Sequence, residues 1–234
     1  MTGRPLILLV LVAAACASPP EATVAPASGP SAPSAEADST FDASVWLADV
    51  EAALADTSRR DDIFGTVRGE TWDAAEAAIG LHRACDTYYD GEAVTYDPWV
   101  EPDAPSRGFT EVVRLGDDEA VVVAQCAYGA YQGNAVLVHV DGNRAVIAEA
   151  PVDPAGAPDL RAAPLTTPSI DPAARTVITF AKARGLGDCG IYAVYRFGPG
   201  AALDAVEVRQ RECSADVPDE VDPATWPLVY SAPE

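Results

Sequence analysis

The fold is decided by residues 189–213, which read CGIYAVYRFGPGAALDAVEVRQREC. Two runs within this stretch, 191–197 and 203–212, are rich in β-branched and aromatic residues, and a Gly-Pro-Gly turn at 198–200 separates them. Strand-like runs on either side of a short turn of this composition are typical of a β-hairpin. The sequence therefore predicts two antiparallel strands here.

The register of this hairpin brings its two cysteines together. If Phe197 pairs with Asp204, then Cys189 and Cys213 lie almost opposite each other on neighbouring strands. Directly opposed residues of an antiparallel pair have Cα atoms about 4.5–5.5 Å apart, which is within the range of a disulfide. We therefore predict a bond between Cys189 and Cys213.

Strand patterns continue upstream of the hairpin. The Asp141-Gly142 dipeptide between two apolar runs is a strong signal for a tight hairpin turn. The predicted strands are 109–115, 120–126, 135–140, 145–150 and 176–183. Because short turns join most of them, we expect an antiparallel meander over about 109–230.

The N-terminal part of the domain has helical periodicity instead. Asp42 is placed to cap a helix over about 43–56, and Thr71 is the expected N-cap of a second helix that Gly80 ends. The predicted fold class is therefore α+β to mainly β: an antiparallel sheet with an N-terminal helical layer over 41–80, in one domain over 41–234.

The first residues indicate export. Arg4, the apolar run 6–12 and three alanines before Cys16 form a signal peptide over 1–15 that ends in a lipid-attachment cysteine. The apolar run is too short to span a membrane. We expect Cys16 to carry acyl chains, the alternative being an unlipidated secreted protein. Ala17 does not resemble an inner-membrane retention signal, which favours the outer membrane, facing the periplasm, if the host has one.

The residues after Cys16 predict a tether. Residues 17–40 are mostly Ala, Ser and Pro, a composition that buries too little apolar surface to fold. With Cys16 at the anchor, two further cysteines remain, Cys85 and Cys126, and in an exported chain they are expected to pair by elimination.

The charge of the chain limits its partners. There are 36 acidic and 15 basic residues, for a net charge of −21. A surface this negative excludes nucleic acid as a natural partner and disfavours adsorption to anionic lipid. It is compatible with simple solubility or with attraction of a basic protein.

The segment 182–190, KARGLGDCG, contains the glycine spacing of a dinucleotide-binding turn. Since a strand rather than a helix is predicted to follow, the helix N-terminus that would hold a phosphate is missing. Two uses remain open for Lys182, Arg184 and Asp188: structural salt bridges around a tight turn, or a small binding site for an anionic group.

A second loop carries recognition-type side chains, namely Tyr128, Tyr131, Gln132 and Asn134. Aromatic and amide groups on a turn are typical of binding surfaces, and equally of packing beside a disulfide.

No metal or cofactor is predicted. The two histidines, His82 and His139, have no zinc-ligand spacing, and we expect His139 on the wetter face of its strand. The acidic residues Asp216, Asp219, Glu220 and Asp222 lack the EF-hand pattern and predict a solvated loop.

Several of these segments, in this order, resemble landmarks of an uncharacterised bacterial envelope family, the domain-of-unknown-function family DUF1176. The resemblance covers about 109–230 and is strongest in KARGLGDCG and the Glu-Cys and Trp-Pro pairs that follow. The landmark segments are 126–133, 165–171, 182–190, 211–213 and 226–230. The resemblance implies export and supplies no activity.

Together these features predict a surface-tethered envelope lipoprotein that acts as a non-catalytic binding or structural module for an envelope component. One alternative is an inhibitor of a basic, lysozyme-like wall-degrading enzyme, which the acidic surface would attract. Another is a hydrolase that acts on envelope polymers.

Overall fold

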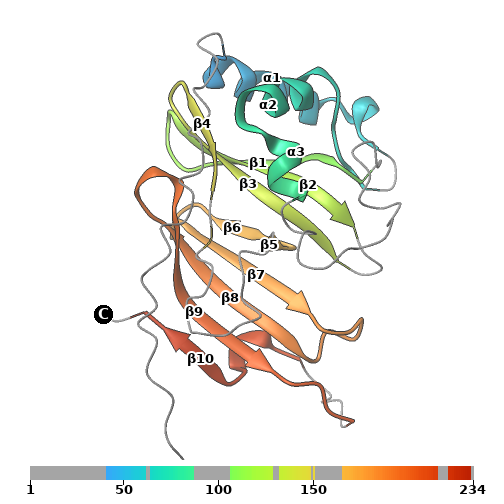
Figure 1. The fold of residues 1–234 in the computed structure, drawn as a ribbon, viewed down its shortest axis with the longest axis vertical. Coiled ribbons are helices and arrows are strands. Elements are labelled where there is room, and N and C mark those ends of the chain that lie inside the picture. Colours follow the sequence, from blue (N-terminus) through green and yellow to red (C-terminus); the bar gives the residue numbers. More distant parts are fainter. Residues whose placement is uncertain are drawn as a thin grey trace, which may run out of the picture. The chain divides into compact units, whose positions relative to one another are not determined.

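The computed structural model describes residues 41–61, 64–86, 106–128, 132–148, 150, 165–215 and 221–232. These residues form three layers (Figure 1): a helical layer, a first antiparallel sheet beneath it, and a second antiparallel sheet packed on the other side of the first. The predicted fold class is confirmed, with the strands divided between two sheets. The predicted signal peptide, Cys16 and the tether lie outside the described residues.

The helical layer begins as predicted and then departs from the prediction at one point. It consists of α1 (Ala43–Ala55), the short η1 (Thr57–Arg59), α2 (Glu70–Ile79) and α3 (Leu81–Asp86). The Asp42 side chain caps α1 by accepting from the backbone N–H groups of Ser44 and Val45, and Gly80 ends α2 in a left-handed conformation. The N-cap of α2 is Gly69 rather than Thr71, because the Thr71 side chain is buried in the helical layer instead of turning back to the helix N-terminus.

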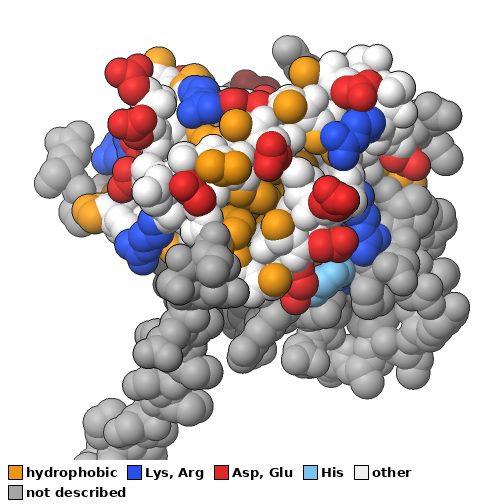
Figure 2. Space-filling model, turned by 90° about the horizontal axis from the view of Figure 1, so that it is seen from above, with side chains coloured by type: hydrophobic (Ala, Val, Ile, Leu, Met, Phe, Trp, Pro, Cys, Tyr) orange, Lys and Arg blue, Asp and Glu red, His pale blue; other side chains and the backbone are white. Residues whose placement is uncertain are grey.

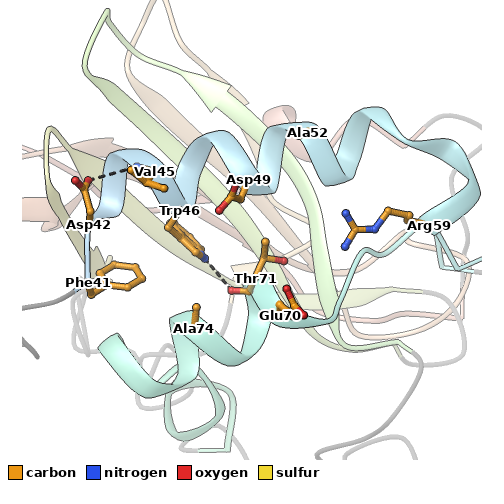
Figure 3. Close-up of a pocket in the computed structure, with 10 residues that line it drawn as sticks. All are labelled: Phe41, Asp42, Val45, Trp46, Asp49, Ala52, Arg59, Glu70, Thr71 and Ala74. Carbon is orange, nitrogen blue, oxygen red and sulfur yellow. Dashed lines mark hydrogen bonds between the residues drawn. The ribbon is translucent and has the colours of Figure 1, made fainter.

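Two tryptophans pack the helices against the first sheet. The indole N–H of Trp46 on α1 donates to the carbonyl oxygen of Thr71 at 2.8 Å, which joins α1 to α2 (Figure 3). The rings of Trp46 and Trp72 both contact Phe109, with centroids 5.5 and 5.2 Å apart. Seen from above (Figure 2), this layer shows apolar side chains in the middle of its face, with acidic and basic side chains around them.

The first sheet has the order β1-β2-β3-β4, with β5 also paired to β3. As predicted, Asp141 and Arg144 form the last pair of a tight hairpin, with Gly142 at φ +55° in its two-residue turn. The strands are β1 (Gly108–Arg114), β2 (Glu119–Tyr128), β3 (Gly133–Asp141), β4 (Arg144–Ile147) and β5 (Leu165–Thr166).

The second sheet has the order β10-β9-β8-β7-β6. Its strands are β6 (Ser169–Asp171), β7 (Thr176–Lys182), β8 (Gly190–Phe197), β9 (Leu203–Arg211) and β10 (Leu228–Ser231). The predicted hairpin is β8–β9, but Phe197 pairs with Leu203 rather than with Asp204. A bulge after Val194 accommodates the extra residue Val206, so the expected register holds beyond it and Gly190 faces Arg211.

The middle strands are buried on both faces. One face of β2 and β3 packs under the helices through residues such as Val122 and Val138, and the opposite face packs on the second sheet through Val121 and Leu137. All four valine and leucine side chains are fully buried. Double burial explains why these two strands are apolar almost throughout rather than alternating.

Both predicted disulfides are present. Cys85 on α3 bonds to Cys126 on β2, with a Cα separation of 5.2 Å, so this bond ties the helical layer to the first sheet. Cys189 bonds to Cys213 with a Cα separation of 5.0 Å, just beyond the paired ends of β8 and β9. The two bonds join residues 41 and 24 positions apart in the sequence.

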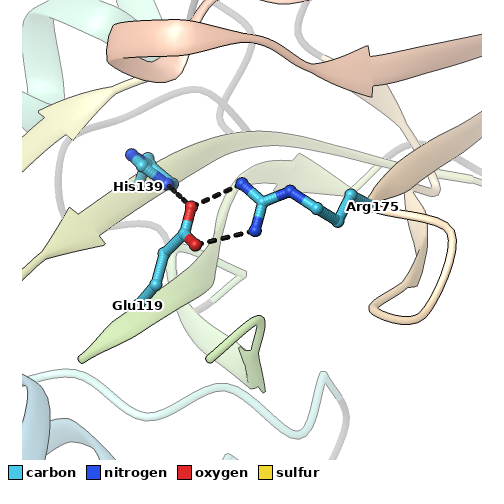
Figure 4. A network of polar contacts seen from close by, with 3 residues as sticks. All are labelled: Glu119, His139 and Arg175. Atoms are coloured by element: carbon cyan, nitrogen blue, oxygen red, sulfur yellow. Dashed lines mark hydrogen bonds and ion pairs between the residues drawn. The ribbon is translucent and has the colours of Figure 1, made fainter. Parts of the chain in front are cut away.

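An ion-pair network joins the two sheets (Figure 4). Glu119 on β2 receives two hydrogen bonds of 2.7 Å from the guanidinium of Arg175, which lies in the turn between β6 and β7. The other partner of Glu119 is His139, whose Nε2 lies 2.7 Å from Oε1. The expectation for His139 was wrong: its side chain is only 9% exposed and stacks on Phe197 of the second sheet. It faces inward because the second sheet covers the side of β3 that a single sheet would expose.

We predict that Glu119→Gln lowers stability at neutral pH and removes part of its acid dependence. Hydrogen bonding from Arg175, and to a lesser extent from His139, lowers the pKa of Glu119 from 4.5 to about 2. Because this pKa is lower in the folded state, the carboxylate stabilises the fold above pH 4.5, and that contribution is lost as the pH falls towards 2. Its size is about 3 kcal/mol. Urea unfolding between pH 2 and pH 7 measures it.

The matched control is Glu51→Gln, because Glu51 makes the same two-bond contact with Arg114 at 2.7 Å on the exposed surface. An exposed pair contributes about 0–1 kcal/mol. If the two variants lose the same stability at pH 7, the network does not hold the sheets together.

Candidate functional site

The segment 182–190 forms a tight turn between β7 and β8, as the sequence predicts. The backbone N–H of Gly187 donates to the carbonyl of Arg184 at 2.9 Å, and Gly187 has a φ of +70°, a conformation that favours glycine. A strand follows directly, so the turn lacks the helix N-terminus of a dinucleotide site.

Arg184 is held by its own turn. Its Nε donates to Oδ1 of Asp188 at 2.7 Å, its Nη2 contacts the other carboxylate oxygen, and Nη2 also donates to the carbonyl of Ser214 at 2.9 Å. Asp188 is buried, and the hydrogen bonds from Arg184 lower its pKa despite the opposing effect of desolvation. Of the two uses left open by the sequence, this geometry favours the salt bridge for Arg184.

The two predicted binding loops meet at Gln132. The backbone N–H of Lys182, at the end of β7, donates to the side-chain Oε1 of Gln132 at 2.9 Å. Tyr128, at the end of β2, is 39% exposed and contacts the ring of Phe64 at a centroid distance of 5.5 Å. The Oδ1 atom of Asn134 is buried without a hydrogen-bond partner. Tyr131 lies outside the described residues.

A cavity opens beside the turn, at the end of the second sheet. In the strand register, Lys182 on β7, Gly190 on β8 and Arg211 on β9 lie directly side by side, so Lys182 and Arg211 project from the same face. Gly190 between them has no side chain, and a Cβ there would lie 2.1 Å from the carbonyl oxygen of Ala181. The cavity has a volume of about 350 Å³ and is lined by residues 181–183, 190, 191 and 210–213.

Aromatic side chains lie next to Lys182, one of the residues that line this cavity. The ammonium of Lys182 lies 5.9 Å from the ring centroid of Phe180, and Phe180 meets Trp226 edge-on at 5.4 Å. Trp226 is 3% exposed, so the Trp-Pro landmark covers this face of the sheet. The charged residues that line the cavity are thus two cations, Lys182 and Arg211, and one acid, Glu212, on a chain that is strongly acidic overall.

Among the remaining candidate groups, His82 and Asp222 have structural partners. His82 lies between the indole of Trp72, at 3.4 Å, and the buried guanidinium of Arg107, at 3.1 Å. Asp222 caps the short helix η3 (Pro223–Thr225) by accepting from the N–H of Ala224, whereas Asp216, Asp219 and Glu220 lie outside the described residues. Within the described ranges, no three His, Cys, Asp or Glu side chains are grouped closely enough for a metal ion.

One residue of this site escaped sequence reasoning. In the sequence, Arg211 is noted only as part of the Arg-Glu-Cys landmark. The strand register places Arg211 on one side of Gly190 and Lys182 on the other. The signal was available in principle, because a hairpin closed at Cys189 and Cys213 puts Gly190 near Arg211. It required the third strand, β7, to bring Lys182 alongside.

We predict that Arg184→Gln lowers the melting temperature, because the buried carboxylate of Asp188 would lose its charged partner. Arg211→Gln is the matched control: within the described part of the chain, the Arg211 side chain makes no hydrogen bond or ion pair, and its longer-range charge lowers the pKa of Asp188 less than Arg184 does. Differential scanning calorimetry at neutral pH compares the two. Equal melting temperatures for the wild type and Arg184→Gln would show that the turn does not depend on this salt bridge.

Comparison with known proteins supports the resemblance noted in the sequence. The model of the family described as "Protein of unknown function (DUF1176)" matches residues 70–233. No curated protein and no solved structure matches the chain. The match begins earlier than the predicted 109 and so takes in α2, α3 and Cys85, while α1 lies before it. From the start of α2 through its second sheet, the chain belongs to the DUF1176 family.

Proposed function

We propose that this chain is a lipid-anchored protein of the bacterial cell envelope whose β-domain is a non-catalytic binding module. The anchor is Cys16, which follows the predicted signal peptide, and residues 17–40 serve as the tether. No helix in the described ranges has the length and apolar character needed to cross a bilayer. With acyl chains on Cys16, the outer membrane facing the periplasm is the favoured location if the host has one.

The ligand of this module is an anionic group of an envelope component, a carboxylate or a phosphate. The observation that carries this proposal is the alignment of Lys182, Gly190 and Arg211 across three neighbouring strands. Strands lie about 4.8 Å apart, so the two cationic residues are on the order of 10 Å apart at their Cα atoms. An anion placed over Gly190 is then within reach of both long side chains.

The surroundings of this cavity favour binding without large rearrangement. The Cys189–Cys213 bond and the Arg184–Asp188 salt bridge fix one side of the cavity, and Gln132 fixes the start of the turn at Lys182. Ligand binding then orders mainly the Lys182 and Arg211 side chains, and a preformed site loses less conformational entropy on binding. The Phe180 ring lies beside the Lys182 ammonium and is backed by the buried Trp226.

The binding test is a calorimetric titration of the full chain with inorganic phosphate and, separately, with acetate. We expect Lys182→Gln and Arg211→Gln each to weaken binding of the preferred anion about tenfold, equivalent to about 1.4 kcal/mol. Arg196→Gln is the matched control, because Arg196 is an exposed cation on the same sheet, at the far end of β8. Equal effects of all three substitutions would contradict the proposed site.

Anchoring has its own prediction. Cys16→Ser removes the thiol that receives the lipid, so the protein is expected to move from the detergent phase to the aqueous phase, or to accumulate as an uncleaved precursor. Ser18→Ala, two residues further along, is the control and retains the wild-type behaviour. Phase partitioning and the molecular mass of both variants decide this, and a Cys16→Ser protein of mature mass that partitions like the wild type would refute lipid anchoring.

A further inference from the structure

The helical layer carries a groove that the proposed anion site does not use. It lies between α1 and α2 and has a volume of about 540 Å³ (Figure 3). Its apolar lining comes from Phe41, Val45, Trp46, Ala52 and Ala74. The Phe41 and Trp46 rings contact each other at a centroid distance of 5.9 Å.

The charges at this groove are mostly negative and uncompensated. Asp42, Asp49 and Glu70 line it, and Arg59 is the single cation of the lining. The carboxylate of Asp42 is occupied by the start of α1. Among the described residues, neither Asp49 nor Glu70 makes an ion pair or a side-chain hydrogen bond. Two free carboxylates beside one guanidinium leave the groove attractive to a cation.

A buried hydroxyl at the groove is the second, independent sign of a ligand. Thr71 lines the groove and is 9% exposed, and its Oγ1 atom has no hydrogen-bond partner. A buried polar atom without a partner destabilises a folded protein, so it calls for an explanation. A polar group of a ligand seated between the helices would provide the missing hydrogen bond.

We propose that this groove binds a cationic amphipathic segment of a basic partner protein. An apolar side chain of the segment packs against Trp46, and a neighbouring lysine or arginine lies beside Asp49 and Glu70. Val45 is 57% exposed at the edge of the groove, which extends the apolar contact beyond the cavity itself. The net charge of −21 draws such a partner to the surface.

The family match starts at Glu70, so it includes α2 but not α1, which supplies Trp46 and Asp49. The inference is independent of the anion site in the second sheet. A basic wall-degrading enzyme, the partner of the inhibitor alternative, is one protein with the required chemistry.

The test uses a synthetic amphipathic peptide with lysines on one face and leucines on the other. The peptide is titrated into the full chain, and binding is measured by calorimetry. We expect the double variant Asp49→Asn/Glu70→Gln to weaken peptide binding at least tenfold, and a peptide with glutamate in place of lysine not to bind. Asp73→Asn is the matched control, since Asp73 is an exposed acid on α2 outside the groove lining. The control binds the lysine peptide within twofold of the wild type.

Thr71→Val separates binding from folding. Valine has nearly the same shape without the hydroxyl, so the melting temperature is expected to stay level or rise while peptide binding weakens. Lys182→Gln should bind the peptide with the wild-type affinity, whether or not this variant loses affinity for the anion. Equal binding by the double variant and Asp73→Asn would overturn the proposal, because the peptide would then be adsorbed by the overall acidic surface.

Discussion

Burial of β2 and β3 on both faces is the constraint on which the rest of the structure depends. These strands lie between the helical layer and the second sheet, so each face must be apolar or internally satisfied. Two polar side chains on these strands show the consequence. Gln125 donates to the carbonyl of Ser106 at 2.9 Å, and His139 is paired with Glu119, which Arg175 reaches from the second sheet.

The same constraint separates the outer surfaces of the domain. The first sheet is covered on both sides, so the surfaces left for ligands are the outer side of the helical layer and the outer face of the second sheet. The first carries the acidic groove around Asp49 and Glu70, and the second carries Lys182 and Arg211 beside Phe180 and Trp226. The two proposals therefore assign the anionic envelope component and the basic protein to separate layers of the domain.

Sequence reasoning succeeded where local rules determine the structure. Residues only a few positions apart determine the Asp42 cap, the left-handed Gly80 and the Asp141-Gly142 turn. The hairpin register predicts one disulfide, and elimination among the remaining cysteines predicts the other. Sequence reasoning failed where packing between distant layers decides. His139 is buried only because a second sheet covers its strand, and Thr71 faces the groove because α1 crosses its helix. The neighbouring positions of β7 and β8 follow from the predicted meander, whereas the groove between α1 and α2 cannot be inferred from spacing along the chain.

The central claim is that β2 and β3 form the doubly covered middle of a three-layer domain, and native-state amide hydrogen exchange tests it most directly. The account predicts that the amides of Val122 and Val138 exchange only through global unfolding, more slowly than those of the second sheet's outer strand β10. If the amides of β2 and β3 instead exchanged through local opening at the rate of β10, these strands would have an exposed face. The three-layer account would then be wrong.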